Sequence, residues 1–201
     1  MQLHWSPKSP YVRKVMVCAI ELNLLPQLKL VRSVAAMLQP NERLMKDNPL
    51  SKIPTLVLDN GLTLFDSGVI CEYLDDLAKG PLFPKKGDTR WQAMRLQALG
   101  NGLLDVLILW RNERERVAPL QALMDAFALK TEACLQQLEA EVANLADTAL
   151  SIGHITVGCA LGYIDYRFDH LNWRTSAPEL ATWYATLCQR SSFQTTVPVD
   201  G

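Results

Sequence analysis

The stretch that decides the fold is MQLHWSPKSPYVRKV, at positions 1–15. A short strand is expected to end near Trp5, and the Ser-Pro pair that follows it predicts a turn. Ser9 is a favoured N-cap residue and Pro10 suits the first position of a helix, so a helix should begin at Ser9. A strand-to-helix turn of this kind directs backbone N–H groups and a serine hydroxyl at one point, where an anion such as a thiolate can be held.

The composition limits the partners that the protein can have. The chain has 201 residues, 49% hydrophobic and 20% charged, which is enough for one large or two small globular domains. Its 20 basic and 21 acidic residues give a net charge of −1, which argues against nucleic acid or an anionic membrane as a partner. No apolar run approaches the roughly 18 residues of a membrane span, and the N-terminus lacks the pattern of a signal peptide. We therefore expect a cytoplasmic protein.

The five cysteines are scattered along the chain and contain no CxxC pair. This usage indicates reduced thiols that pack as small hydrophobic side chains. The three histidines have no metal-ligand spacing with them, so we expect no metal site.

The predicted elements of the first part of the chain follow the order β-α-β-α-β-β-α. They are a strand to residue 5, a helix from 9 to about 24, a strand at 27–31, a short helix at 41–47, a hairpin formed by 52–58 and 62–65, and a helix from 68 to about 78. Asn60-Gly61 lies between two β-rich runs and is the strongest hairpin signal. The pattern predicts a parallel strand pair and an antiparallel pair covered by helices, an α/β domain at residues 1–79.

The character of the sequence changes after a linker at residues 80–87, which contains two prolines and two glycines. Helical periodicity dominates residues 88–201, which predicts an all-helical domain. The expected helices are a long one that ends in the charged stretch 111–116, one at 120–147, an apolar one at 151–170 in the centre of a bundle, and a last one at 178–189. We interpret the stretch 111–116 as a solvated face.

This layout resembles the cytosolic glutathione transferase family, a thioredoxin-like domain followed by a helical bundle. The motifs that carry the resemblance are Ser9-Pro10-Tyr11 for its serine-type, bacterial-like catalytic turn, Ile53-Pro54 for its cis-proline loop, Asp66-Ser67 for its acidic-plus-serine motif, and 151–170 for its buried helix. The resemblance covers essentially the whole chain.

The resemblance implies that glutathione is the co-substrate and that the catalytic residue is Ser9, whose hydroxyl would hold the sulfur as a thiolate. It also implies a cis bond before Pro54 and pairing of the Ile53 main chain with the cysteinyl backbone of glutathione. Asp66 would meet the ammonium and Ser67 the α-carboxylate of the γ-glutamyl group. The implied glutathione-binding set is Ser9, Lys52, Ile53, Pro54, Asp66 and Ser67.

The thiolate would attack a hydrophobic electrophile, as in detoxification. The resemblance places this second substrate between the domains, in a pocket walled by Pro7, Tyr11 and Trp110, and suggests a homodimer. Isomerisation, dehalogenation and peroxide reduction share the same thiolate and stay open.

The residues themselves leave simpler interpretations open. Ser9 can serve only as a helix cap, with Ser6 as the rival hydroxyl, and Asp66-Ser67 can be an ordinary capping pair. Lys52 can be a solvated lysine, and Tyr11 suits packing or a pocket wall better than a catalytic acid. The alternative function is a non-catalytic binding or regulatory protein of the same fold. Disulfide exchange through this turn is excluded, because serines stand where related dithiol enzymes carry CxxC.

One departure from the family pattern concerns the buried helix, which usually opens with Ser/Thr-x-x-Asp. Here His154 follows Ser151 at that spacing. We expect a cap weaker by about 1 kcal/mol, because histidine lacks the reciprocal carboxylate.

Overall fold

The computed structural model describes residues 1–200, which form two compact units. One unit comprises Met1–Phe83 together with residues 192–200, and the other is Pro84–Ser191. Every strand of the described residues belongs to the first unit, and the second is built from helices. The expected fold class, a small mixed α/β domain and an all-helical domain, is confirmed.

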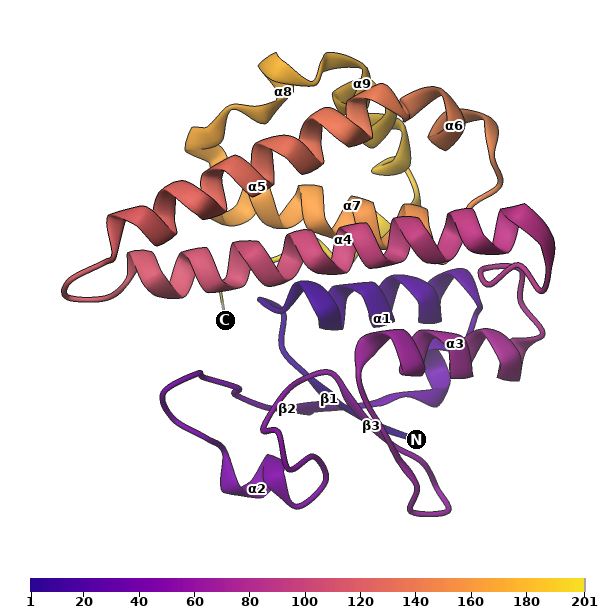
Figure 1. Ribbon diagram of the computed structural model, residues 1–201. Coiled ribbons are helices and arrows are strands. Elements are labelled where there is room, and N and C mark those ends of the chain that lie inside the picture. The colour runs from indigo at the N-terminus through magenta and orange to yellow at the C-terminus, as the bar shows by residue number, and fades with distance from the viewer. Residues whose placement is uncertain (201) are drawn as a thin grey trace. The chain divides into compact units, whose positions relative to one another are not determined.

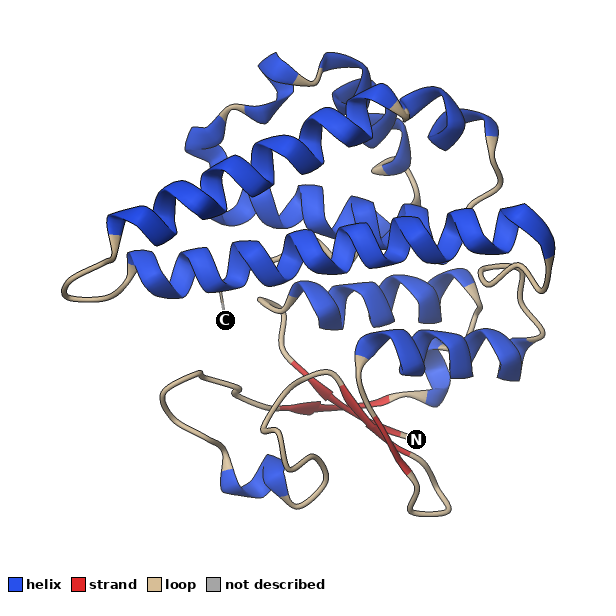
Figure 2. Cartoon of the chain, in the orientation of Figure 1, coloured by secondary structure: helices blue, strands red, loops and turns tan. Residues whose placement is uncertain are grey.

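The first unit has the predicted β-α-β-α-β-β-α order (Figures 1 and 2). Its elements are β1 (Gln2–Trp5), α1 (Pro10–Glu21), β2 (Lys29–Arg32), α2 (Glu42–Met45), β3 (Thr55–Val57), β4 (Thr63–Leu64) and α3 (Ser67–Ala78), with a 3-10 turn at Leu25–Gln27. The sheet order is β2-β1-β3-β4. Strand β1 is parallel to β2 and antiparallel to β3, and β3 is antiparallel to β4.

Local chemistry explains where these elements begin and end. Ser9 caps α1 as predicted, since its Oγ accepts the backbone N–H of Val12 at 3.3 Å. The helix ends at Glu21, earlier than expected, and the chain enters the left-handed region two residues later, at Asn23 (φ 57°). The hairpin is confirmed, and Gly61 supplies the positive φ of 86° that its turn requires.

The core of this unit lies between the sheet and the helices α1 and α3, which run side by side along it (Figure 1). Apolar side chains from both layers are fully buried there: Leu3, Val15, Leu56, Ile70 and Leu74. The helices therefore rest on the sheet through the apolar faces that their periodicity predicts.

The helical unit is built around the pair α4 and α7. Its elements are α4 (Gly87–Arg114), α5 (Gln121–Ala140), α6 (Val142–Asp147), α7 (Ile152–Arg167), a 3-10 turn (Asp169–Leu171), α8 (Trp173–Ser176), α9 (Pro178–Leu187) and α10 (Ser191–Gln194), which ends in the first unit. A Cβ on Gly100 of α4 would lie 2.9 Å from the side chain of Thr156 on α7. Glycine at this position therefore lets the two helices approach closely.

Two helix boundaries differ from the prediction. The helix expected at 120–147 is two helices, because the chain leaves helical geometry at Glu141, whose carboxylate bonds Arg95 of α4 and Gln137. The helix expected at 151–170 ends at Arg167 and is followed by the 3-10 turn.

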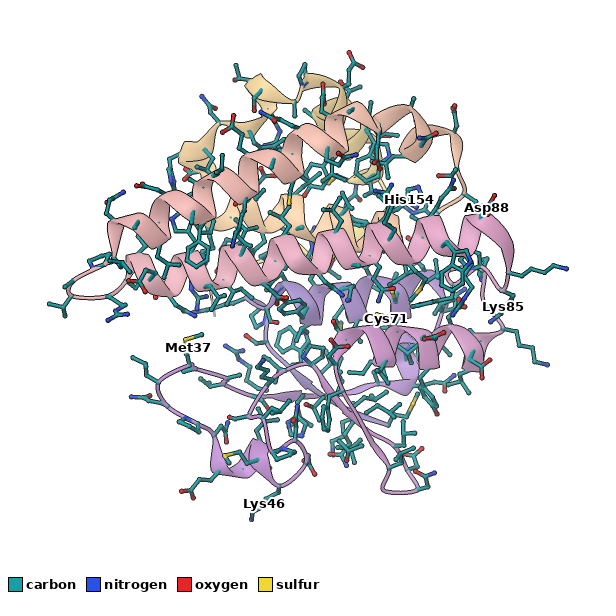
Figure 3. All side chains as sticks on the ribbon, viewed as in Figure 1. Met37, Lys46, Cys71, Lys85, Asp88 and His154 are labelled. Atoms are coloured by element: carbon teal, nitrogen blue, oxygen red, sulfur yellow. The ribbon has the colours of Figure 1, made fainter. Side chains whose placement is uncertain are left out.

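At the start of α7, the structure shows the reciprocal capping bond that histidine was not expected to make. Ser151 and His154 form a complete capping box, in which Nδ1 of the imidazole accepts the backbone N–H of Ser151 at 3.1 Å. The acceptor role of Nδ1 assigns the ring proton to Nε2, which donates to the carbonyl of Leu145 at 3.1 Å. A neutral histidine thus replaces the carboxylate. His154, which Figure 3 labels among these helices, is 4% exposed, and burial lowers its pKa although the Leu145 hydrogen bond opposes this.

Candidate functional site

The strand register brings the three predicted motifs to one edge of the sheet. Residue His4 on β1 pairs with Thr55 on β3, and Leu56 pairs with Leu64 on β4. Strand β1 therefore ends at the edge where β3 begins and where β4 ends. The serine turn follows β1, Ile53-Pro54 precedes β3, and Asp66-Ser67 follows β4 at this edge. Helices α1 and α3 also begin there, so two positive helix ends face the same region.

The serine turn offers two hydroxyls in different surroundings. Ser6 is buried, at 9% exposed, and its Oγ accepts the N–H of Lys8 at 3.4 Å. Ser9 is half-buried, and within residues 1–200 its Oγ accepts only the capping N–H of Val12. A hydroxyl that accepts a capping bond keeps its own proton. Ser9 can therefore cap α1 and still donate a hydrogen bond to an anion.

The loop before β3 has the predicted cis bond between Ile53 and Pro54, which confirms that expectation. Lys52 is exposed and Ile53 is half-buried. The carbonyl of Lys52 accepts the hydroxyl of Thr55 at 2.8 Å and Nδ2 of Asn48 at 3.1 Å. The loop is thus fixed by polar side chains on both sides of Pro54.

Asn48 is the centre of this loop. It is 1% exposed, and its Nδ2 also donates to Oγ1 of Thr55 at 2.9 Å, while its Oδ1 accepts the N–H of Leu50 at 3.0 Å. Asn48 is not among the site residues predicted from the sequence. Its position before a proline marks a turn, but nothing in the sequence indicates that its amide supports Lys52.

A second polar group links the sheet to the same loop. Nε2 of the buried His4 lies 2.8 Å from Oδ2 of Asp47, and its Nδ1 lies 2.8 Å from Oγ of Ser33. Since a carboxylate only accepts, Nε2 carries a proton. This group ties β1 to the residue next to Asn48. The sequence gives no signal for this contact, because Asp47 lies 43 positions from His4.

The third motif lies at the start of α3. Asp66 is the exposed N-cap residue, and its Oδ1 accepts the N–H of Gly68 at 2.8 Å. Its peptide bond to Phe65 is cis. Ser67 is 2% exposed. One carboxylate oxygen of Asp66 therefore caps α3, as the capping interpretation predicts, and the other oxygen can bind a cation.

The three residues expected to wall a second-substrate pocket lie in different units. Pro7 and Tyr11 are half-buried beside the serine turn in the first unit. Trp110 belongs to α4 and is 6% exposed, and its ring lies 5.0 Å from that of Phe168. Its role in a pocket stays a prediction.

The C-terminal segment contacts the helix that carries Ser9. Nη2 of Arg13 donates to the carbonyl of Phe193 at 3.2 Å, and its guanidinium lies 5.4 Å from the centre of that ring. Lys8 on the turn pairs with Asp200 at 3.8 Å. No short motif in the sequence signals these contacts, which join residues about 180 positions apart.

Two features are absent from residues 1–200. They contain no group of three or more His, Cys, Asp or Glu side chains placed to hold a metal ion. No helix in this part of the chain has both the length and the apolar character needed to cross a bilayer.

Comparison with known proteins supplies family matches over both parts of the chain. Residues 8–77 match the glutathione S-transferase N-terminal domain family, and residues 121–186 match the glutathione S-transferase C-terminal domain family. A structure of a glutathione transferase family member from Pseudomonas fluorescens with bound glutathione is 43% identical, with a TM-score of 0.95 over 99% of both chains.

Two further relatives extend this comparison. A structure of a Pseudomonas fluorescens family member with bound S-(propanoic acid)-glutathione is 41% identical, with a TM-score of 0.91 over the full length of both chains. The uncharacterised GST-like protein YibF of Escherichia coli is 27% identical over 98% of both chains.

Proposed function

Because the chain belongs to the glutathione transferase family, we propose that it is an enzyme that binds glutathione at the edge of the sheet where α1 and α3 begin. The single observation that carries this proposal is the convergence of the Ser9 turn, the Ile53-Pro54 loop and the Asp66-Ser67 cap at that edge. The two relatives with bound glutathione or a glutathione adduct support it.

Each part of glutathione has a suitable partner in this proposal. The main-chain N–H and C=O of Ile53 pair with the cysteinyl backbone, and Lys52 lies close enough along the loop to bind a carboxylate. The ammonium of the γ-glutamyl group binds the oxygen of Asp66 that is not used in the cap. Its α-carboxylate binds Ser67 and the N–H groups at the start of α3.

Ser9 would keep the sulfur of glutathione ionised. An ordinary thiol with a pKa near 8.5 is only about 3% ionised at pH 7, and lowering the pKa by about two units requires roughly 2.7 kcal/mol. A hydrogen bond from the Ser9 hydroxyl together with the positive end of α1 can supply this stabilisation. The thiolate then forms a carbon–sulfur bond to the electrophile, and a leaving group such as chloride departs with its electron pair.

The assembly and location of the enzyme are part of the proposal. We place it in the cytoplasm, where glutathione is abundant and the five free cysteines stay reduced. We also propose a homodimer. Val69 and Leu77 lie two turns apart on α3 and are 48% and 46% exposed, and Leu62 of the hairpin is 54% exposed. Exposed apolar side chains such as these would be covered in a dimer interface.

The test compares the wild type with Ser9→Ala and Ser6→Ala in conjugation of glutathione to a neutral aryl halide, and measures glutathione binding directly. We expect Ser9→Ala to bind glutathione but to lose about tenfold or more of its turnover number, and Ser6→Ala to lose little. A larger loss in Ser6→Ala would assign the donor role to Ser6. Glutathione binding by the wild type without turnover of any electrophile would instead support the non-catalytic alternative.

A further inference from the structure

The helical unit contains a cavity of about 350 Å³ beside the first turns of α4. Its walls come from α4, from α6 and from the segment that leads into α7. All the lining residues belong to Pro84–Ser191, so the cavity lies within one unit and shares no residue with the proposed glutathione site. A cavity of this volume is large enough for a small organic molecule.

The floor of the cavity is apolar and buried. Ala93 and Leu96 of α4 are 4% and 8% exposed, and Leu145 of α6 is 2% exposed. The buried ring of His154, labelled close to α4 in Figure 3, also lines the cavity. Both its nitrogens are already used, by the N–H of Ser151 and by the carbonyl of Leu145. This floor therefore favours the apolar part of a ligand.

The mouth of the cavity is polar. Gln92 of α4 and both Asn144 and Asp147 of α6 are exposed and line it. Within residues 1–200, none of these three side chains forms a hydrogen bond or an ion pair. The two amide oxygens and the carboxylate are all acceptors. The mouth therefore presents three acceptors to a group that donates hydrogen bonds.

The charges that line the cavity add up to one negative charge. Arg95 and Glu141 form an ion pair, in which Gln137 also donates to Glu141. The hydrogen bond between Arg95 and Glu141 raises the pKa of the arginine and lowers the pKa of the glutamate, so both stay charged and neutralise each other. The carboxylate of Asp147 is left, and it favours a cation.

Hydrogen bonds hold the wall that carries Asn144 and Asp147 in place. The hydroxyl of Thr148 donates to the carbonyl of Asn144 at 2.7 Å, and Nε2 of His154 donates to the carbonyl of Leu145 at 3.1 Å. The apolar floor and the polar mouth are therefore formed before a ligand arrives, which lowers the entropy cost of binding.

We propose that this cavity binds a small organic amine with an apolar body. The three N–H donors of its ammonium group match the carboxylate of Asp147 and the amide oxygens of Gln92 and Asn144. Its hydrocarbon part lies against the buried floor. The proposal does not depend on the proposed glutathione site, because the two sites have no residue in common.

The experiment compares three molecules that share a phenyl ring on a two-carbon chain and differ in the charge of the head group: phenethylamine, phenethyl alcohol and hydrocinnamate. Titrations followed by the amide chemical shifts of the protein give both the dissociation constant and the place of binding. The variants are Asp147→Asn, which removes the charge, and Ala149→Phe, which puts a large side chain on the exposed wall of the cavity. The matched control is Asp88→Asn, an exposed carboxylate of α4 outside the lining (Figure 3).

We expect phenethylamine to shift the amides of the lining residues and to bind about tenfold more tightly than the alcohol or the acid. In Asp147→Asn the affinity for the amine should fall about 5- to 10-fold while that for the alcohol stays within about twofold. Asp88→Asn should bind all three as the wild type does. Ala149→Phe should weaken amine and alcohol alike, and saturating glutathione should change none of these values.

The proposal is overturned if phenethylamine shifts no amides or only amides outside the cavity, or if hydrocinnamate binds as tightly as the amine. It is also overturned if Asp147→Asn and Asp88→Asn lose affinity for the amine equally. A protein that does not bind glutathione contradicts the proposed function, whereas the amine titration still decides whether the cavity binds an amine.

Discussion

The clearest mutational prediction concerns Asn48, the buried amide that supports the loop before Pro54. Replacement by alanine removes its two donor bonds, to the carbonyl of Lys52 and to Thr55, and its acceptor bond from Leu50. At about 1 kcal/mol per bond the sum is about 3 kcal/mol. In the variant, the hydroxyl of Thr55 still donates to the carbonyl of Lys52 at 2.8 Å, so neither group is left without a partner. We therefore expect a smaller net loss, about 2 kcal/mol, in the free energy of unfolding.

The same loss should weaken glutathione binding without affecting the chemical step. Lys52 and Ile53 belong to this loop, whereas Ser9 lies on α1. We therefore expect the dissociation constant of glutathione to rise about tenfold in Asn48→Ala, equivalent to about 1.4 kcal/mol, with kcat at saturating glutathione within about threefold of the wild type. Isothermal titration calorimetry and steady-state kinetics measure the two quantities, and urea denaturation measures the stability.

Asn60→Ala is the matched control, because Asn60 makes one exposed hydrogen bond in the hairpin, from the N–H of Leu62 at 3.0 Å. It should leave glutathione affinity unchanged. Two results would contradict a supporting role for Asn48: a loss of stability in Asn48→Ala with wild-type affinity for glutathione, or a fall in kcat as large as the fall in affinity.

Two further predictions concern stability and assembly. Burial lowers the pKa of His154 in the folded state below its value near 6.5 in the unfolded chain, so the folded state binds fewer protons. The contribution of His154 to stability should therefore be fully present above pH 6.5. Below that pH the free energy of unfolding should fall by up to about 1.4 kcal/mol per pH unit. Urea titrations should show that His154→Ala loses this component of the slope and that the exposed-residue variant His170→Asn retains it; equal slopes in all three proteins would contradict the assignment. Val69→Glu should convert the proposed dimer to a monomer in light scattering, while Leu129→Glu, on an exposed site of α5, should not; a wild-type monomer would disprove the dimer.

Local signals in the sequence were sufficient to predict most elements of the N-terminal unit. The Ser9 cap, the Asn60-Gly61 turn and the Asp66 cap each involve residues close together in the chain, so their chemistry can be recognised from spacing alone. The convergence of these motifs depends on the order of the strands, which spacing alone does not give; the family resemblance implied only that the motifs share one glutathione site.

What could not be predicted depends on contacts between distant residues or on the protonation of a side chain. His4 meets Asp47 across 43 positions, and Arg13 meets Phe193 across 180. The capping role of His154 was missed because sequence patterns look for a carboxylate, whereas a neutral imidazole accepts the same N–H. The break at Glu141 contains neither glycine nor proline, the residues that usually mark the end of a helix.

The central claim is that Ser9 keeps the sulfur of bound glutathione ionised at neutral pH. The direct measurement is a pH titration of the ultraviolet absorbance of the thiolate in the glutathione complexes of the wild type and Ser9→Ala. We predict a pKa for the wild-type complex about two units below that of a free thiol, and a return toward the free value by at least about one unit in Ser9→Ala. A wild-type complex that titrates like free glutathione, or identical titrations in both proteins, would contradict the claim.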